Sequence, residues 1–294
     1  HKRDTSGVAA LIWGGLFFLA AVAMQEVPPI TIALFRVVGA LPALALFVWF
    51  KGVTLPRSAK IWGAYLVMGA LNNAIPFSLI FWGQTQITSG LASILNGATG
   101  VIGVIVAGLL LRDERLTPPK LIGVTIGFSG VALTIGLDAL RSFDIRSLAQ
   151  LAVLLAGLSY SLAGVWAKLR LAGQAPEMNA LGMLMGSSLL MMPTVLWLDG
   201  PPSFALMPST WAALVALAVL CTSRPDLLYF NILKRAGSGN LMLVTLLIPP
   251  IAIGLGVAFL NEPLQATALT GFTLIALGLA IIDGRLWKVL RPNR

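Results

Sequence analysis

The sequence predicts an all-α membrane protein with ten transmembrane helices, arranged as two inverted five-helix repeats around a central cavity. Three observations point to this fold class. Apolar residues dominate the composition, apolar windows long enough to cross a bilayer follow one another along almost the whole chain, and one stretch of the chain returns at a constant offset.

The composition excludes a soluble domain. Apolar residues make up 57% of the chain and charged residues 11%, with a mean hydropathy of +0.90, whereas soluble domains carry roughly 25% charged residues. The apolar runs do not alternate as the strands of an outer-membrane barrel do. The net charge of +9 comes from short basic clusters between apolar runs, so we expect a lipid bilayer as partner and no nucleic acid.

Ten apolar windows are separated by charged clusters, proline and glycine. Each approaches or exceeds the roughly 20 mainly apolar residues that a helix needs to cross a bilayer. The expected spans are 8–25, 29–50, 60–83, 88–111, 119–138, 148–168, 177–198, 209–233, 238–260 and 265–284. Every connection is short, so no separate soluble domain is expected between them.

The basic residues predict the orientation of these spans. Lys and Arg in short loops are retained on the cytoplasmic side, and with the N-terminus inside, 16 of the 20 basic residues lie on that side. Arg141 and Arg146 then face outwards, while Arg36 and Arg224 lie within spans. We therefore expect a multi-pass membrane protein with both termini in the cytoplasm.

A repeat relates the two halves of the chain. Residues 88–114 and 236–262 are both long apolar runs that end in a glutamate, Glu114 and Glu262, at an offset of 148. Five spans per half is an odd number, so the second copy must enter the membrane upside down. The basic residues near Glu114 are absent near Glu262, as an inverted-topology repeat requires. We divide the chain into repeats 1–143 and 144–294.

Several short motifs accompany this architecture. The first span contains Trp13-Gly14, the second contains Arg36, the fourth ends in Gly-Leu-Leu-Leu-Arg-Asp-Glu-Arg-Leu at 108–116, and the ninth ends in Asn-Glu-Pro-Leu at 261–264. With these motifs the chain resembles the drug/metabolite transporter superfamily, in particular its ten-helix EamA-type transporters. Within that group it looks similar to bacterial amino-acid and metabolite exporters, including the aromatic amino-acid exporter branch.

The resemblance implies a transporter of the bacterial inner membrane that exports small metabolites, most of all amino acids including aromatic ones, by alternating access. Sugar-phosphate, nucleotide-sugar and drug transporters share the architecture and stay as alternatives, as does a lipid scramblase. The resemblance also implies that spans 1, 3, 4, 6, 8 and 9 lie near the cavity, whereas spans 5 and 10 lie at the periphery.

Polar residues in mid-span are candidates for substrate binding, because burial in a membrane costs a few kcal/mol and disfavours accidental placement. Span 3 carries Asn72 and Asn73, and span 4 carries Asn96. Adjacent residues of an α-helix point about 100° apart, so we expect only Asn73 to face the cavity, with Phe77 one turn later on the same face. The alternative for Asn73 and Asn96 is a hydrogen bond that only holds helices together.

Aromatic side chains within the spans suit an aromatic or apolar substrate. Trp13 and Phe17 lie one helical turn apart on one face of span 1. Tyr160 in span 6 and Tyr229 in span 8 are further candidates for lining the cavity. Ordinary packing is the alternative for Trp13, Phe17 and Tyr160.

Charged residues in or near the spans divide into two groups. Arg36 lies deep in span 2 and its guanidinium suits a carboxylate or phosphate, although the resemblance equally implies a structural role that does not depend on the substrate. Glu114 and Glu262 lie at span ends, where we expect them to terminate helices and accept hydrogen bonds from neighbouring loops. The tripeptide 224–226, Arg-Pro-Asp, places a proline and two charges in span 8 and is either a functional helix break or a peculiarity of this sequence.

Enzyme chemistry is not expected. A lipid-modifying enzyme would need a catalytic His, a cluster of metal ligands or paired acids, and the only histidine is His1. The single cysteine, Cys221, excludes an internal disulfide and a cysteine-based metal cage. We therefore expect no cofactor and no metal, a small-molecule substrate, and a monomer or homodimer, with the glycine-rich spans 5 and 10 packing within one chain or against another.

Overall fold

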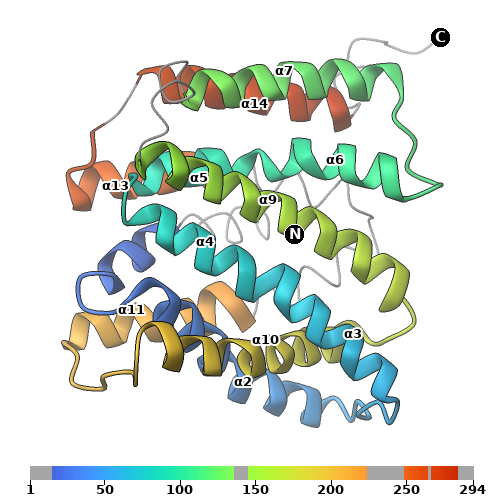
Figure 1. Ribbon diagram of the computed structural model, residues 1–294, viewed down its shortest axis with the longest axis vertical. Helices are drawn as coiled ribbons and strands as arrows, with labels where there is room; N and C mark the ends of the chain where they lie inside the picture. The colour runs from blue at the N-terminus through green and yellow to red at the C-terminus, as the bar shows by residue number, and fades with distance from the viewer. Residues whose placement is uncertain (1–14, 136–144, 224–247, 264–265, 284–294) are drawn as a thin grey trace.

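The computed structural model describes residues 15–135, 145–223, 248–263 and 266–283, and every regular element within these ranges is a helix (Figure 1). The predicted all-helical membrane fold is thus confirmed. Seven helical segments are long and apolar enough to cross a membrane: Pro29–Phe50, Ala59–Gln84, Ser89–Leu110, Pro118–Ile135, Ile145–Arg170, Pro176–Leu198 and Ala266–Asp283. They match the expected spans 2 to 7 and 10 closely.

Three expected spans are described in part. In span 1, residues 15–23 are helical. Span 8 begins with the helix α11 (Pro208–Ala218), and span 9 ends with α13 (Ile248–Leu260).

Proline and threonine set the starts of several helices. The helices α2 (Pro29–Phe50), α10 (Pro176–Leu198) and α11 each carry a proline in the first turn, where its missing N–H has no partner to lose. At the start of α5 (Ser89–Gly97), the Thr88 side chain accepts a hydrogen bond from the backbone N–H of Leu91. These local signals explain why the predicted span starts agree with the structure within a few residues.

Two spans are interrupted by π-helical turns. Span 3 consists of α3 (Ala59–Gly69), the π-helical turn η1 (Ala70–Ala74) and α4 (Ile75–Gln84). In span 8, α11 leads into a second π-helical turn, η2 (Val219–Ser223). The turns begin 149 residues apart, one residue from the repeat offset, so both halves place a wide turn at the same point of the corresponding span. Such turns are rare and often accompany functional sites.

The helices of the two halves pair in a reciprocal pattern. Among the described elements, α2 packs against α11 and η2, and α10 packs against α3 and η1. Because α2 corresponds to α10 and span 3 corresponds to span 8 in the repeat, the two pairs are equivalent. The pairs formed by α5 with α13, and by α7 (Pro118–Ile135) with α14 (Ala266–Asp283), each join two corresponding helices of the repeat.

The pair α7 and α14 lies at one edge of the bundle (Figure 1). Only 28% of each span is buried, against 56% for Ala59–Gln84 and for α9 (Ile145–Arg170), in agreement with the expected peripheral position of spans 5 and 10. A Cβ atom on Gly130 would lie 2.6 Å from the Gly271 carbonyl oxygen, and one on Gly123 would lie 2.5 Å from the Gly278 carbonyl oxygen. The glycines of both helices therefore allow close backbone approach within one chain.

Candidate functional site

A buried arginine lies at the centre of the candidate site. Among the residues that the structure describes, Arg36 of α2 is the only charged side chain classed as buried, with 4% of its surface exposed. Its guanidinium carbon lies 3.7 Å from the centre of the Phe77 ring. Its Nε donates to Thr222 Oγ1 at 2.6 Å, and its Nη2 donates to the Cys221 carbonyl oxygen at 2.9 Å. A cation in mid-membrane costs a few kcal/mol, and these three contacts offset part of that cost.

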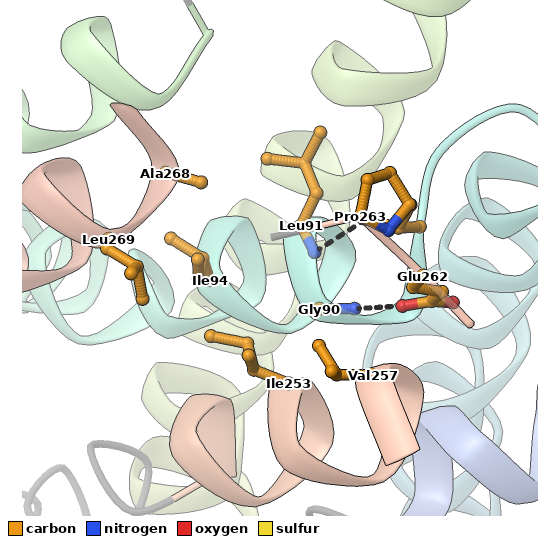
Figure 2. Close-up of a pocket in the computed structure, with 10 residues that line it drawn as sticks. Gly90, Leu91, Ile94, Ile253, Val257, Glu262, Pro263, Ala268 and Leu269 are labelled. Atoms are coloured by element: carbon orange, nitrogen blue, oxygen red, sulfur yellow. Dashed lines mark hydrogen bonds between the residues drawn. The ribbon is translucent and has the colours of Figure 1, made fainter. Parts of the chain in front are cut away.

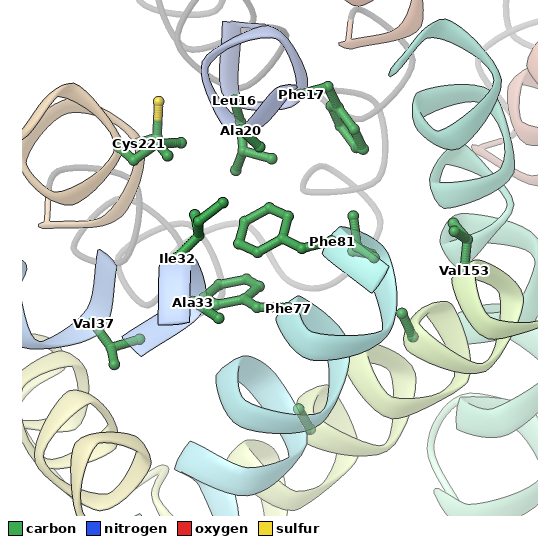
Figure 3. Close-up of a cluster of buried hydrophobic side chains, with 14 of the residues drawn as sticks. Leu16, Phe17, Ala20, Ile32, Ala33, Val37, Phe77, Phe81, Val153 and Cys221 are labelled. Atoms are coloured by element: carbon green, nitrogen blue, oxygen red, sulfur yellow. The ribbon is translucent and has the colours of Figure 1, made fainter. Parts of the chain in front are cut away.

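Aromatic rings continue from the arginine towards the second half of the chain. The Phe77 ring of α4 meets Tyr160 of α9 edge to face, with ring centres 6.3 Å apart, and stacks on Phe81 with ring centres 6.2 Å apart. Figure 3 shows the Phe81 ring beside Ile32 and the Phe77 ring beside Ala33, both of α2. We name Arg36, Phe77, Phe81 and Tyr160 the arginine–aromatic cluster.

The π-helical turn η1 carries two buried polar residues. Asn72 and Asn73 have 7% and 0% of their surfaces exposed. The Asn72 Nδ2 donates to the Met183 sulfur at 3.2 Å, and the Asn73 Nδ2 donates to Ser187 Oγ at 3.3 Å. Both asparagines thus join span 3 to α10, which is the helix-holding alternative given for Asn73, and the expectation that only Asn73 faces the cavity stays a prediction.

The two π-helical turns use the same arrangement. The turn η1 in span 3 contacts α10, which is span 7, through Asn73 and Ser187. In the same way, η2 in span 8 contacts α2, which is span 2, through Thr222 and Arg36. At an offset of 149, Asn73 corresponds to Thr222. Sequence reasoning missed Ser187 and Thr222, because the repeat offset of 148 aligns Asn73 with Cys221 and the offset of 149 became visible only from the π-helical turns.

Three of the predicted site residues, Arg36, Phe77 and Tyr160, are brought together in the arginine–aromatic cluster. Asn73 lies on the turn directly before α4. Phe17 belongs to the apolar core with 2% of its surface exposed, and its carbonyl oxygen accepts a hydrogen bond from Gln84 Nε2. These residues lie close to, but do not all touch, the buried guanidinium.

The remaining predicted residues lie elsewhere. Asn96 is half-buried near the end of α5, and no hydrogen-bond partner for its Oδ1 is found within the described structure. None of the described contacts joins it to the arginine–aromatic cluster. Trp13, Tyr229 and the tripeptide 224–226 lie outside the described residues.

Three carboxylates gather at the end of the bundle where α13 ends, which we call the Glu262 end. Glu262 accepts hydrogen bonds from the backbone N–H of Ser89 at 2.8 Å and from Ser89 Oγ at 2.8 Å. It also accepts one from the backbone N–H of Gly90 at 3.2 Å (Figure 2). The expected role of Glu262 at a helix end therefore includes a partner helix in the other half. Glu26 and Asp199 make similar contacts that sequence reasoning did not single out, since both lie in short polar connections with no repeat partner to mark them.

The opposite end of the bundle, which we call the Lys168 end, carries an ion pair. The Lys168 ammonium of α9 lies 2.6 Å from Asp113 Oδ2 and 2.9 Å from Glu114 Oε1. The hydrogen bond from Lys168 holds the pKa of Asp113 below its ordinary value. Asp113 is 67% exposed, whereas Lys168 and Glu114 are 35% and 23% exposed. Because water and salt reach these side chains, the ion pair is screened and contributes little to stability.

The arginine–aromatic cluster is chemically suited to a small anion with a flat or apolar body. A guanidinium binds carboxylate and phosphate through paired hydrogen bonds, and aromatic rings stack on aromatic or apolar groups. The cluster therefore offers charge and stacking surfaces of the kind that bind a substrate.

A family model matches the chain twice. The EamA-like transporter family is matched over residues 7–136 and again over residues 147–283. These two ranges cover most of the chain and divide it between spans 5 and 6.

Curated relatives match the chain along most of its length. An uncharacterized transporter, YoaV, from Bacillus subtilis (strain 168) is 23% identical over 272 residues, which are 92% of this chain and 92% of the relative. An uncharacterized transporter from Archaeoglobus fulgidus is 26% identical over 270 residues, 90% of this chain and 92% of the relative. Protein PagO from Salmonella typhimurium is 24% identical over 251 residues, 84% of this chain and 81% of the relative.

A solved structure, described only as the crystal structure of a protein, is similar with a TM-score of 0.69 at 20% sequence identity. The match covers 95% of this chain and 96% of that chain. At this identity the likeness concerns the fold alone.

Proposed function

Because the chain belongs to the EamA-like transporter family, we propose that this membrane transporter exports small metabolites, above all amino acids including aromatic ones. The three relatives reported above have names that state no substrate. The choice of substrate class therefore rests on the residues of this chain.

The observation that carries the proposal is the stacking of Arg36 on Phe77. A buried guanidinium beside an aromatic ring, with Tyr160 at the edge of that ring, offers an amino acid two complementary contacts. The substrate carboxylate pairs with the guanidinium, and its side chain stacks against the rings of the cluster. Arg36 keeps its contacts with η2 on one side while the substrate approaches from the other.

Alternating access is supported by the reciprocal packing of the two halves, 1–143 and 144–294. Transporters with inverted repeats bind substrate near the bilayer midplane between the repeats, and the two repeats then rock against each other. The arginine–aromatic cluster joins α2 and α4 of the first half to α9 and η2 of the second half. A relative movement of the halves changes this site directly.

The distribution of basic residues supports an orientation with both termini in the cytoplasm of a bacterial cell. The Lys168 end then faces the cytoplasm and the Glu262 end faces outwards. The glycine faces of α7 and α14 pack against each other within the chain. A homodimer would therefore have to form through a different lipid-facing surface. Movement down the substrate gradient, with weak or no ion coupling, is the expected energetic mode.

Transport by purified protein in liposomes tests the proposal. Liposomes are preloaded with unlabelled Phe, and uptake of labelled Phe, Trp, Thr and a sugar phosphate is measured in parallel, with protein-free liposomes as background. The proposal expects exchange of Phe and Trp above that of the sugar phosphate. Transport of the sugar phosphate alone would assign Arg36 to a phosphate and would replace the amino-acid proposal by its main alternative.

A further inference from the structure

Three hydrogen-bonded contacts between the two halves share one chemical pattern at the Glu262 end. In each, a carboxylate from one half accepts a hydrogen bond from a backbone N–H and another from a buried hydroxyl at the start of a helix in the other half. The hydroxyls belong to Thr31, Ser89 and Thr210, and each residue is at most 2% exposed.

The contact of Glu262 is the most extensive. Its carboxylate follows α13 in the second half and accepts three hydrogen bonds at the start of α5 in the first half. A helix start has unsatisfied N–H groups and the positive end of the helix dipole, so a carboxylate is favoured there. Charge-assisted hydrogen bonds of this kind are roughly twice as strong as neutral ones.

The other two contacts run in both directions between the halves. Asp199 of the second half accepts from Thr31 N at 3.0 Å and from Thr31 Oγ1 at 2.7 Å, in the first turn of α2. Glu26 of the first half accepts from the backbone N–H of Met207 and from Thr210 Oγ1, at the start of α11. Each helix start thus depends on the opposite half for its carboxylate.

A small apolar cleft lies next to the Glu262 contact. It is lined by residues of α5, α13 and α14, among them Leu91, Ile94, Ile253 and Val257, and its rim includes Glu262 (Figure 2). One turn deeper on the face of α5 that carries Ser89 lies Ser93, which is fully buried. The Glu262 contact therefore bridges α5 and α13 above the buried Ser93 side chain.

We propose that Glu262, Asp199 and Glu26 together form the gate that closes one end of the transport path between the two halves. The inference rests on the proposed alternating access and, for the assignment of this gate to the outer membrane face, on the proposed orientation. When the halves separate at this end, each carboxylate leaves its helix start and water replaces it on the hydroxyl and the N–H groups. The three contacts therefore favour the state that is closed at the Glu262 end.

Thiol labelling at Ser93 tests the gate. The native thiol is removed by Cys221→Ala, which leaves no other cysteine, and Ser93→Cys places a near-isosteric reporter beneath the Glu262 contact. A membrane-impermeant maleimide is added to vesicles from either side, without substrate. In the closed state we expect slow labelling of position 93. Glu262→Gln is expected to raise the labelling rate from the Glu262 end roughly tenfold, and Asp199→Asn and Glu26→Gln to raise it further.

Matched variants distinguish opening of the gate from a general loss of helix packing. Glu177→Gln neutralises a carboxylate in the first turn of α10, at the Lys168 end, and should leave the labelling rate unchanged. Ser89→Ala removes one of the three hydrogen bonds to Glu262 and should raise the rate less than Glu262→Gln does. This variant also keeps the test decisive if Glu262→Gln fails to give a monodisperse protein.

Monodisperse Glu262→Gln and triple variants that label at the unsubstituted rate from the Glu262 end would overturn the gate. So would an increase seen only from the Lys168 end. Because labelling is measured without substrate, these results do not depend on which solute the protein carries. Failure of the amino-acid proposal appears separately, in the liposome exchange assay.

Discussion

Arg36 reaches from α2 towards α4, where its guanidinium carbon lies 3.7 Å from the centre of the Phe77 ring. Cation–π contacts contribute about 0.5–1 kcal/mol when exposed and about 2 kcal/mol or more when desolvated. Both side chains here are only 4% exposed. The contact therefore fixes the guanidinium plane and also keeps it beside an aromatic surface that a substrate ring can share.

Phe77→Leu tests this contact. Leucine keeps the site apolar but removes the ring, so we expect weaker exchange of labelled Phe and a lower unfolding temperature in detergent. Phe47→Leu is the matched control, because Phe47 pairs with Lys51 at 5.6 Å and is 36% exposed. Equal effects of the two substitutions on exchange would show that the Phe77 ring is not special to the site.

Thr222→Val tests how η2 holds the arginine. Valine has nearly the shape of threonine but cannot accept the hydrogen bond from Arg36 Nε. Leaving a buried charged donor without this acceptor should lower the free energy of unfolding by roughly 1.5–3 kcal/mol. Thr270→Val is the control, because Thr270 is exposed on α14 and its Oγ1 donates to the Ala266 carbonyl oxygen of the same helix. This substitution should change the free energy of unfolding far less. A wild-type unfolding free energy for Thr222→Val would contradict the structural role given to this bond.

Gly130→Ala tests the close approach of α7 and α14. The added Cβ atom would lie 2.6 Å from the Gly271 carbonyl oxygen, so the helices must move apart, at a cost of about 1–3 kcal/mol. Thermal unfolding of Gly254→Ala provides the control, since nothing lies within 4 Å of a Cβ atom at that position. If both variants unfold at the same temperature, the two helices do not need the glycine contact.

Lys168→Gln tests the ion pair at the opposite end. Lys168 lowers the pKa of Asp113 from its ordinary value of 3.8, so the stabilisation is fully present above that value. It is lost as the pH falls through the lowered value. The difference in unfolding temperature between wild type and Lys168→Gln should be small at neutral pH and low salt, and should vanish in strong acid or high salt. A large difference that persists at high salt would mean that Lys168 has a further role.

The sequence predicted the helix boundaries well because proline, glycine and charged clusters act locally. Pro29, Pro176 and Pro208 begin helices where the apolar windows begin. The sequence did not predict the π-helical turns. Each turn packs against a helix of the other half, and its extra residue does not change the pattern of apolar residues along the span. The pairing of Asn73 with Ser187, on a helix of the other half, was therefore not predicted.

The candidate site shows the same division. Arg36, Phe77 and Tyr160 were identifiable singly, as a charge and two aromatic residues in mid-span. Their contact depends on how α2, α4 and α9 cross, which a single sequence does not state. Glu262 was correctly placed at a helix end, but its partner Ser89 lies 173 residues away and became visible only in the fold.

The most direct measurement of the central claim compares Phe with phenylalaninamide as competitors of labelled Phe exchange in proteoliposomes. The amide keeps the aromatic ring but lacks the carboxylate that Arg36 is proposed to bind. We predict that unlabelled Phe competes and that phenylalaninamide competes at least about tenfold more weakly, as expected for the loss of about 1.4 kcal/mol or more of charge-assisted hydrogen bonding. Equal competition by Phe and its amide would contradict carboxylate recognition by Arg36.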